Sequence, residues 1–106
     1  MKVLVKKTIS YYAKKYPMAE TQLLTWFNEF SKLEFDNFNE LKNVYGNASI
    51  VNNNRVVFNI KGNDFRLVVS VNFVQAAGYV IWFGTHKQYD KINVESIAFD
   101  TTILNG

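Results

Sequence analysis

The sequence predicts an α+β fold in which helices pack on one face of a mostly antiparallel sheet. Two observations support this. Apolar residues recur at helical spacing in the first half of the chain, up to about residue 45. After Gly46, short runs alternate between apolar and polar residues and are separated by turn residues. A length of 106 residues with 48% hydrophobic residues suits one modest core, so residues 1–106 should form a single domain.

The first half should contain a short strand followed by two or three helices. Lys2 to Lys6 is a β-type run, and a helix is then indicated by apolar residues at i, i+3, i+4 and i+7: Ile9, Tyr12, Ala13 and Tyr16. Pro17 should end this helix, because proline disfavours the helical conformation in the residue before it. Pro17 can also open the next helix, whose first turn has no amide partner to lose.

The second helix has the strongest pattern in the chain. Its apolar residues form one stripe, which we interpret as core: Leu23, Trp26, Phe27, Phe30 and Leu33. A shorter third helix is expected from Phe38 to Tyr45, ending at Gly46. The helices should cover one face of the sheet and leave the other face open.

The second half reads as four strands. A strand should start within Ala48 to Val51, and the asparagines at 52–54 should form a turn. Three longer strands are expected near Arg55 to Ile60, Phe65 to Asn72 and Tyr79 to Phe83.

Gly62 and Asn63 between two alternating runs predict a two-residue type II′ turn. The register then pairs Ile60 with Phe65 and Lys61 with Asp64. One face of the hairpin is apolar and should meet the helices: Val56, Phe58, Ile60, Phe65, Leu67 and Val69. The other face carries Arg55, Asn59, Lys61 and Arg66, together with Val57, Asp64 and Val68.

The charges of this second face allow two interpretations. Three cations (Arg55, Lys61 and Arg66) would follow two neighbouring strands of an open face, as a polyanion-binding surface requires. Any half-exposed sheet, however, shows polar residues to solvent. The overall charge of +3 does not decide between them, although residues 1–16 contain five lysines and no acidic residue.

The segment GTHKQYDKI, Gly84 to Ile92, predicts a short helix after the last strand. Thr85 and Gln88 have the spacing of a capping box, which places His86 in the first turn. Tyr89 and Asp90 follow His86 by three and four residues, so the three side chains should lie on one surface. Histidine is suited to proton transfer near neutral pH. Alternatively, His86 merely occupies a helix start and Tyr89 packs.

The composition argues against metal and redox chemistry. The chain has no cysteine and one histidine, so disulfides, Cys-ligated metals and a histidine cluster are not expected, and we predict no metal or cofactor. One histidine beside a basic face is compatible with metal-free RNA cleavage. Attack by the ribose 2′-hydroxyl needs a base, a cation for the phosphorane charge and an acid for the leaving oxygen. DNA lacks that hydroxyl.

The stretches NNRVVFNIKGNDFRLVV (Asn53 to Val69) and GTHKQYDKI together resemble the HigB-type branch of the RelE-like toxins of bacterial toxin–antitoxin systems. A weaker similarity extends through WFNEF and LKNVYGNASIV. The resemblance implies the RelE-like fold and a metal-free endoribonuclease that cleaves mRNA during translation on the ribosome. It also implies neutralisation by a helix-turn-helix antitoxin of the HigA type, with no DNA binding by the toxin itself. No apolar run is long enough to span a membrane. Together with the resemblance, this leads us to expect a cytoplasmic protein of a bacterium.

Carried over by position, the resemblance implies two groups of site residues. The catalytic candidates are Lys61, Arg66, His86 and Tyr89. The general acid and base are unassigned between His86 and Tyr89, and Tyr89 could instead stack on a base or orient the nucleotide that is cleaved. The RNA-binding candidates are Arg55, Asn59, Lys87 and Lys91.

One position departs from the resemblance. In YVIWFGTH, Ile81 stands where related sequences often carry an arginine. A regular strand places Trp82 on the opposite face from Ile81, so Trp82 is not expected to replace that arginine. The leading hypothesis is an mRNA endonuclease. A non-catalytic RNA- or ribosome-binding module is the alternative, and a protein-binding domain is a third option.

Overall fold

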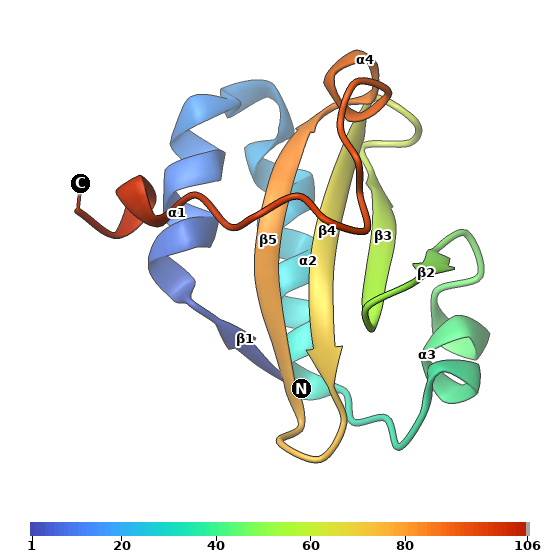
Figure 1. Ribbon diagram of the computed structural model, residues 1–106. Coiled ribbons are helices and arrows are strands. Elements are labelled where there is room, and N and C mark those ends of the chain that lie inside the picture. Colours follow the sequence, from blue (N-terminus) through green and yellow to red (C-terminus); the bar gives the residue numbers. More distant parts are fainter. Residues whose placement is uncertain (106) are drawn as a thin grey trace.

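A computed structural model of the chain, describing residues 1–105, contains a five-stranded sheet with helices packed behind it (Figure 1). The strand order is β1-β5-β4-β3-β2, with bounds β1 Lys2–Leu4, β2 Ser49–Val51, β3 Arg55–Ile60, β4 Phe65–Asn72 and β5 Ala77–Thr85. β1 runs parallel to β5, and the other neighbours are antiparallel. The predicted α+β fold with a mostly antiparallel sheet is confirmed.

The helices follow the predicted order. They are α1 Lys6–Lys15, α2 Glu20–Lys32, α3 Phe38–Val44 and α4 His86–Tyr89, with 3₁₀ turns at Pro17–Ala19 and Thr101–Asn105. β1 ends at Leu4, two residues earlier than predicted, because α1 already begins at Lys6. Pro17 ends α1 as expected and opens the 3₁₀ turn that leads into α2. None of the helices within residues 1–105 combines the length and the apolar character needed to cross a membrane.

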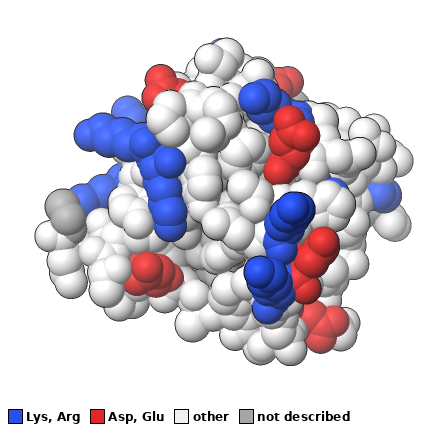
Figure 2. All heavy atoms as spheres, turned by 90° about the horizontal axis from the view of Figure 1, so that it is seen from above, with Lys and Arg blue, Asp and Glu red and all other residues white. Residues whose placement is uncertain are grey.

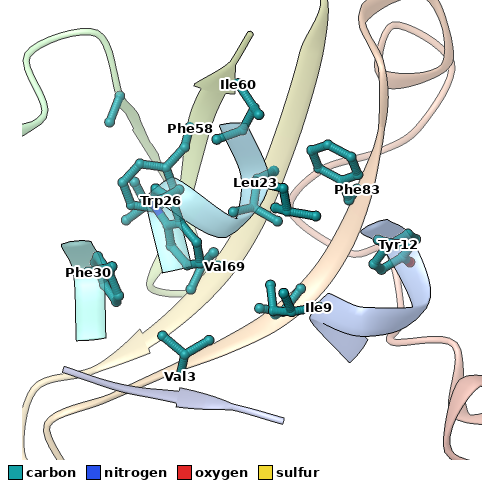
Figure 3. Close-up of a cluster of buried hydrophobic side chains, with 14 of the residues drawn as sticks. Val3, Ile9, Tyr12, Leu23, Trp26, Phe30, Phe58, Ile60, Val69 and Phe83 are labelled. Carbon is teal, nitrogen blue, oxygen red and sulfur yellow. The ribbon is translucent and has the colours of Figure 1, made fainter. Parts of the chain in front are cut away.

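Aromatic side chains from α2 and from the sheet fill the core between these two layers (Figure 3). Trp26 stacks on Phe30 with ring centroids 4.9 Å apart, and Phe30 meets Phe58 of β3 edge-on at 5.7 Å. Leu23 and Phe30 are completely buried. Complete burial of one such side chain stabilises the fold by about 1.5–3 kcal/mol. The predicted α2 stripe is therefore core, with Phe27 and Leu33 partly buried at its margin.

The β3–β4 register is the predicted one: Ile60 pairs with Phe65, and Asn59 pairs with Arg66. All six residues predicted for the core face are at most 4% exposed. The turn differs in one respect. Gly62 has the positive φ that the predicted turn requires, 64°, but Lys61 also has a positive φ of 55°. The ladder consequently stops at Ile60 and Phe65, so Lys61 is a turn residue and does not continue the basic strand face.

The second face of the sheet is not open, and this expectation was wrong. The segment after α4 crosses it in front of β3, β4 and β5 and ends beside α1 (Figure 1). Arg55 Nη1 donates a hydrogen bond to Val94 O at 2.8 Å, and Ile103 is 3% exposed. The physical reason lies in the valines on this face. Val57 and Val68 are 3% and 0% exposed, and burying apolar side chains of this kind is favourable.

Gly78 of β5 provides a test of the core packing. A Cβ at this position would lie 2.9 Å from the Phe30 ring and 3.1 Å from Val69, so Gly78→Ala overpacks the core. We expect a loss of about 1–3 kcal/mol in the free energy of unfolding, measured by urea denaturation. Gly46→Ala is the matched control, because a Cβ there meets nothing within 4 Å. Equal stability of the two variants would contradict the described packing.

Candidate active site at the α4 end of the sheet

α4 is held in place by hydrogen bonds at its first turn. Gln88 N–H donates to Thr85 Oγ1 at 3.2 Å, and Thr85 N–H donates to Gln88 Oε1 at 2.9 Å, so the predicted capping box is confirmed. Tyr16 at the end of α1 donates its hydroxyl to the same Gln88 oxygen at 2.9 Å. His86 N–H donates to Asp64 O in the β3–β4 turn at 3.0 Å. Helix α1, the hairpin turn and β5 therefore fix the orientation of α4.

His86 and Asp90 lie next to each other on the solvent side of this short helix, as their spacing predicts. His86 Nε2 is 3.5 Å from Asp90 Oδ1, and the two side chains are 51% and 63% exposed. The carboxylate can stabilise the imidazolium that forms when the histidine takes up a proton. The pair is therefore accessible to a large ligand.

Arg66 and Tyr89 bring a cation and a phenol to the same end of the sheet. Arg66 lies on β4, and its Nη1 donates to Asn63 O at 3.0 Å and to Phe65 O at 3.2 Å. Burial raises the pKa of Tyr89 above its usual value of 10, the Arg66 charge lowers it, and the Asp90 charge raises it. The net direction is upward, so Tyr89 carries its proton at neutral pH. At that pH it has a proton to give, although burial makes the phenol a weaker acid than a free tyrosine.

A bulge in β5 adds Trp82 to this face, which the sequence analysis missed. Val68 pairs with Trp82, but the next residue, Val69, pairs with Val80, so Ile81 is an extra residue in β5. Directly paired residues share a face, and Val68 shares its face with Arg66. Trp82 consequently lies on the Arg66 face. The expectation of regular alternation at Ile81 was wrong, because one unpaired residue shifts the phase of every residue after it.

Gly84 makes room for the Trp82 ring. It pairs directly with Arg66, and a Cβ at Gly84 would lie 2.6 Å from Trp82 Cη2 and 2.6 Å from Gln88 Oε1. The indole therefore lies over the Gly84 backbone, beside Arg66. Its centroid is 6.3 Å from the Tyr89 ring, with an interplanar angle of 48°. In the sequence, the glycine of the GTH segment is the signal that could have indicated this close approach.

Ile81 occupies different surroundings. It lines an apolar hollow of about 340 Å³ together with Val80, Phe99 and Leu104. Ile81 is thus an apolar contact near the C-terminal segment in this chain.

Two of the candidate residues from β3 and its turn, Arg55 and Lys61, do not join the group around Arg66, whereas Asn59 pairs directly with Arg66 and shares its face. Arg55 pairs with Ser70, which is four residues from Arg66 and hence about 13 Å away along β4. Lys61 and Asn59 line a separate hollow of about 460 Å³ between the edge of β3, α2 and the α3–β2 loop. The predicted track of three cations was therefore wrong, because the turn removes Lys61 and the C-terminal segment holds Arg55.

The remaining basic candidates, Lys87 and Lys91, are exposed on and just after α4. Figure 2 looks onto this end of the molecule. Basic side chains form separate groups around a mostly uncharged centre, with acidic side chains beside some of them. Positive charge at this end is patchy, so recognition here depends on the uncharged and aromatic groups as well.

The fold and this site define a class: a small α+β protein whose exposed histidine, protonated tyrosine and arginine form a set suited to acid–base chemistry on a phosphodiester. A model of the HigB toxin family, the RelE-like toxic component of a toxin–antitoxin system, matches residues 19–92, and the chain belongs to this family. The matched range includes every candidate site residue.

Curated relatives agree with this assignment. The mRNA interferase toxin HigB of Escherichia coli strain K12 is 32% identical over 92 residues, which are 85% of this chain and 88% of that protein. The mRNA interferase HigB of Shigella flexneri has the same identity and coverage. The mRNA interferase HigB of Escherichia coli O6:H1 is 24% identical over 94 residues, covering 87% of this chain and 91% of the relative.

The electrostatic contacts of Tyr89 lead to a test of the site geometry. Arg66→Ala should raise the pKa of Tyr89 further, because it removes the cation that favours the phenolate, and Asp90→Asn should lower it. Alkaline titration of tyrosinate absorbance, with the matching Tyr89→Phe protein subtracted in each case, measures both shifts. Identical titrations of the two variants and the parent would show that the three residues do not meet.

Proposed function

We propose that this chain is the toxin of a type II toxin–antitoxin system and acts as a ribosome-dependent endoribonuclease on mRNA. Family membership and the relatives named mRNA interferase support the general activity. The observation that carries the chemical proposal is the convergence of Arg66, Tyr89 and the His86–Asp90 pair at one end of β4 and β5. These groups supply the three functions that cleavage by a 2′-hydroxyl needs.

We assign the roles from the chemistry of each side chain. His86 takes the proton of the ribose 2′-hydroxyl, whose oxygen forms a new bond to the adjacent phosphorus. Arg66 stabilises the negative charge of the phosphorane. Tyr89 gives its proton to the 5′-oxygen as the bond between phosphorus and that oxygen breaks. The products are a 2′,3′-cyclic phosphate and a 5′-hydroxyl, and every proton transfer uses a side chain of this protein.

The other candidates receive supporting roles in this proposal. Lys87 and Lys91 contact phosphates on either side of the cleaved bond, because they are exposed on the same short segment as His86. Asn59 pairs with Arg66 and contacts RNA at the margin of the site. Lys61 contributes positive potential rather than a catalytic contact, and Arg55 fixes the C-terminal segment through Val94.

Membership of a toxin–antitoxin family implies an antitoxin partner. We propose a helix-turn-helix antitoxin of the HigA type that blocks either the α4 end of the sheet or α1. The lysines of α1 are Lys6, Lys7, Lys14 and Lys15, all exposed, and the first turn of this helix has no acidic residue. An antitoxin that docks on α1 would therefore present an acidic surface.

A non-catalytic RNA- or ribosome-binding module is the second candidate. The observation that favours it is Ile81, whose place in related sequences is often taken by an arginine and which here lines an apolar hollow. Under this alternative, the protein binds the ribosome or mRNA through the same surface and leaves the RNA intact.

Primer extension on an mRNA in a purified translation system tests the proposal. The parent protein should create new 5′ ends only when ribosomes translate. His86→Ala should slow cleavage about 10²- to 10⁴-fold, and Arg66→Ala about 10²- to 10³-fold, through loss of proton transfer and of charge stabilisation. Lys32→Ala is the control, because Lys32 is exposed at the end of α2 and distant from the site in sequence.

Parent-like cleavage by both site variants would show that the site is assigned wrongly. Intact mRNA with the folded parent, together with ribosome binding that weakens steeply with salt, would favour the binding module.

A further inference from the structure

Trp82 does not pack into the hydrophobic core between the helices and the sheet. The hydrophobic core built by residues 1–105 contains Trp26 and its phenylalanine neighbours, together with partly buried residues at its edge, and Trp82 belongs to neither group. It is half-buried on the opposite face of the sheet. A large indole kept partly in solvent beside a candidate active site calls for a function other than core packing.

The local backbone is arranged around this indole. The bulge at Ile81 turns Trp82 toward the Arg66 face, and the missing side chain at Gly84 lets the ring lie close to β5. Tyr89 approaches from α4, with its ring centroid 6.3 Å from that of Trp82 and the rings inclined by 48°. Two aromatic rings thus lie together at the end of the sheet whose face carries Arg66, and the Arg66 charge acts on Tyr89.

Rings and a cation in this arrangement fit a nucleotide. A nucleobase is flat and stacks on an aromatic face whatever its sequence, and an arginine beside the stack can bind the attached phosphate. The general rule for single-stranded RNA is the same: unstacked bases are bound by aromatic side chains.

We propose that Trp82, together with Tyr89, forms a stacking subsite for one nucleobase of single-stranded RNA next to Arg66. The proposal rests on the proposed function for the identity of its ligand as RNA. It assigns Trp82 a binding role, in which the indole positions the nucleotide whose phosphate meets Arg66. Because the indole is uncharged, Trp82 does not supply the positive charge of the arginine that the resemblance implies at position 81.

Nuclear magnetic resonance on the isotope-labelled full chain tests this subsite. The probe is a trinucleotide of 2′-O-methyl RNA, which binds without being cleaved because it lacks the attacking hydroxyl. The chain has two tryptophans, so two indole N–H signals are expected, and Trp82→Phe identifies which is which. The Trp82 signal should move during the titration, and the signal of Trp26, which is 4% exposed, should stay in place.

Two replacements separate stacking from a structural role. Trp82→Leu keeps an apolar side chain but has no aromatic face, and it should bind the trinucleotide about 5- to 100-fold more weakly. Trp82→Phe should retain affinity close to the parent. Trinucleotides that lack one base, at each of the three positions in turn, identify the stacked base. At one position the loss of the base should weaken binding to the parent, and the same loss should not weaken binding to Trp82→Leu any further.

Three results would overturn the proposal: equal loss of affinity in the Leu and Phe variants, an unmoved Trp82 signal while other signals shift, or no binding of the trinucleotide by the folded parent. The proposed function fails by a different result, which is intact mRNA in the translation system. Cleavage with an unmoved Trp82 signal removes only the stacking subsite. A shifted Trp82 signal without cleavage removes only the nuclease.

Discussion

The one-residue bulge at Ile81 is the constraint on which the site depends. Below it, Val80 faces the core beside Val69, and above it Trp82 faces away from the core beside Val68. If Ile81 paired with Val68 instead of forming the bulge, the regular ladder would place Trp82 opposite Leu67 in the core and Phe83 opposite Arg66. With the bulge, Phe83 is 1% exposed in the core and Gly84 lies opposite Arg66. The bulge therefore sets both the aromatic packing and the surroundings of the arginine.

Several features of the α4 end depend on this register. Gly84 lies on the same face as Trp82, two residues further along β5, and its missing side chain leaves room for the indole. Thr85, the next residue, caps α4. The Gln88 oxygen accepts hydrogen bonds from Thr85 and Tyr16, so the same cap also attaches α4 to α1. Tyr89 and His86 are carried on this fixed helix. The core and the candidate site are thus coupled through a few residues of β5.

Much of the fold was predictable because its signals are local and periodic. Strands β3 and β4 have the predicted bounds, since strict alternation and the Gly62 turn leave one register that buries the apolar face. The capping box gave the start of α4 for the same reason. The bulge could not be predicted, because an extra residue in an apolar run leaves no mark in composition. The C-terminal segment could not be predicted either. Its attachment depends on Arg55 meeting the carbonyl of Val94, a contact between residues distant in sequence.

Backbone nuclear Overhauser effects between β4 and β5 test this register most directly. The account predicts contacts between paired backbone protons of Val68 and Trp82 and of Val69 and Val80, with Ile81 unpaired. The Trp82 ring should show contacts to Gly84 and Tyr89. A contact between Val68 and Ile81, with the Trp82 ring close to core residues such as Leu67, would contradict the account. It would show a regular strand and remove Trp82 from the candidate site.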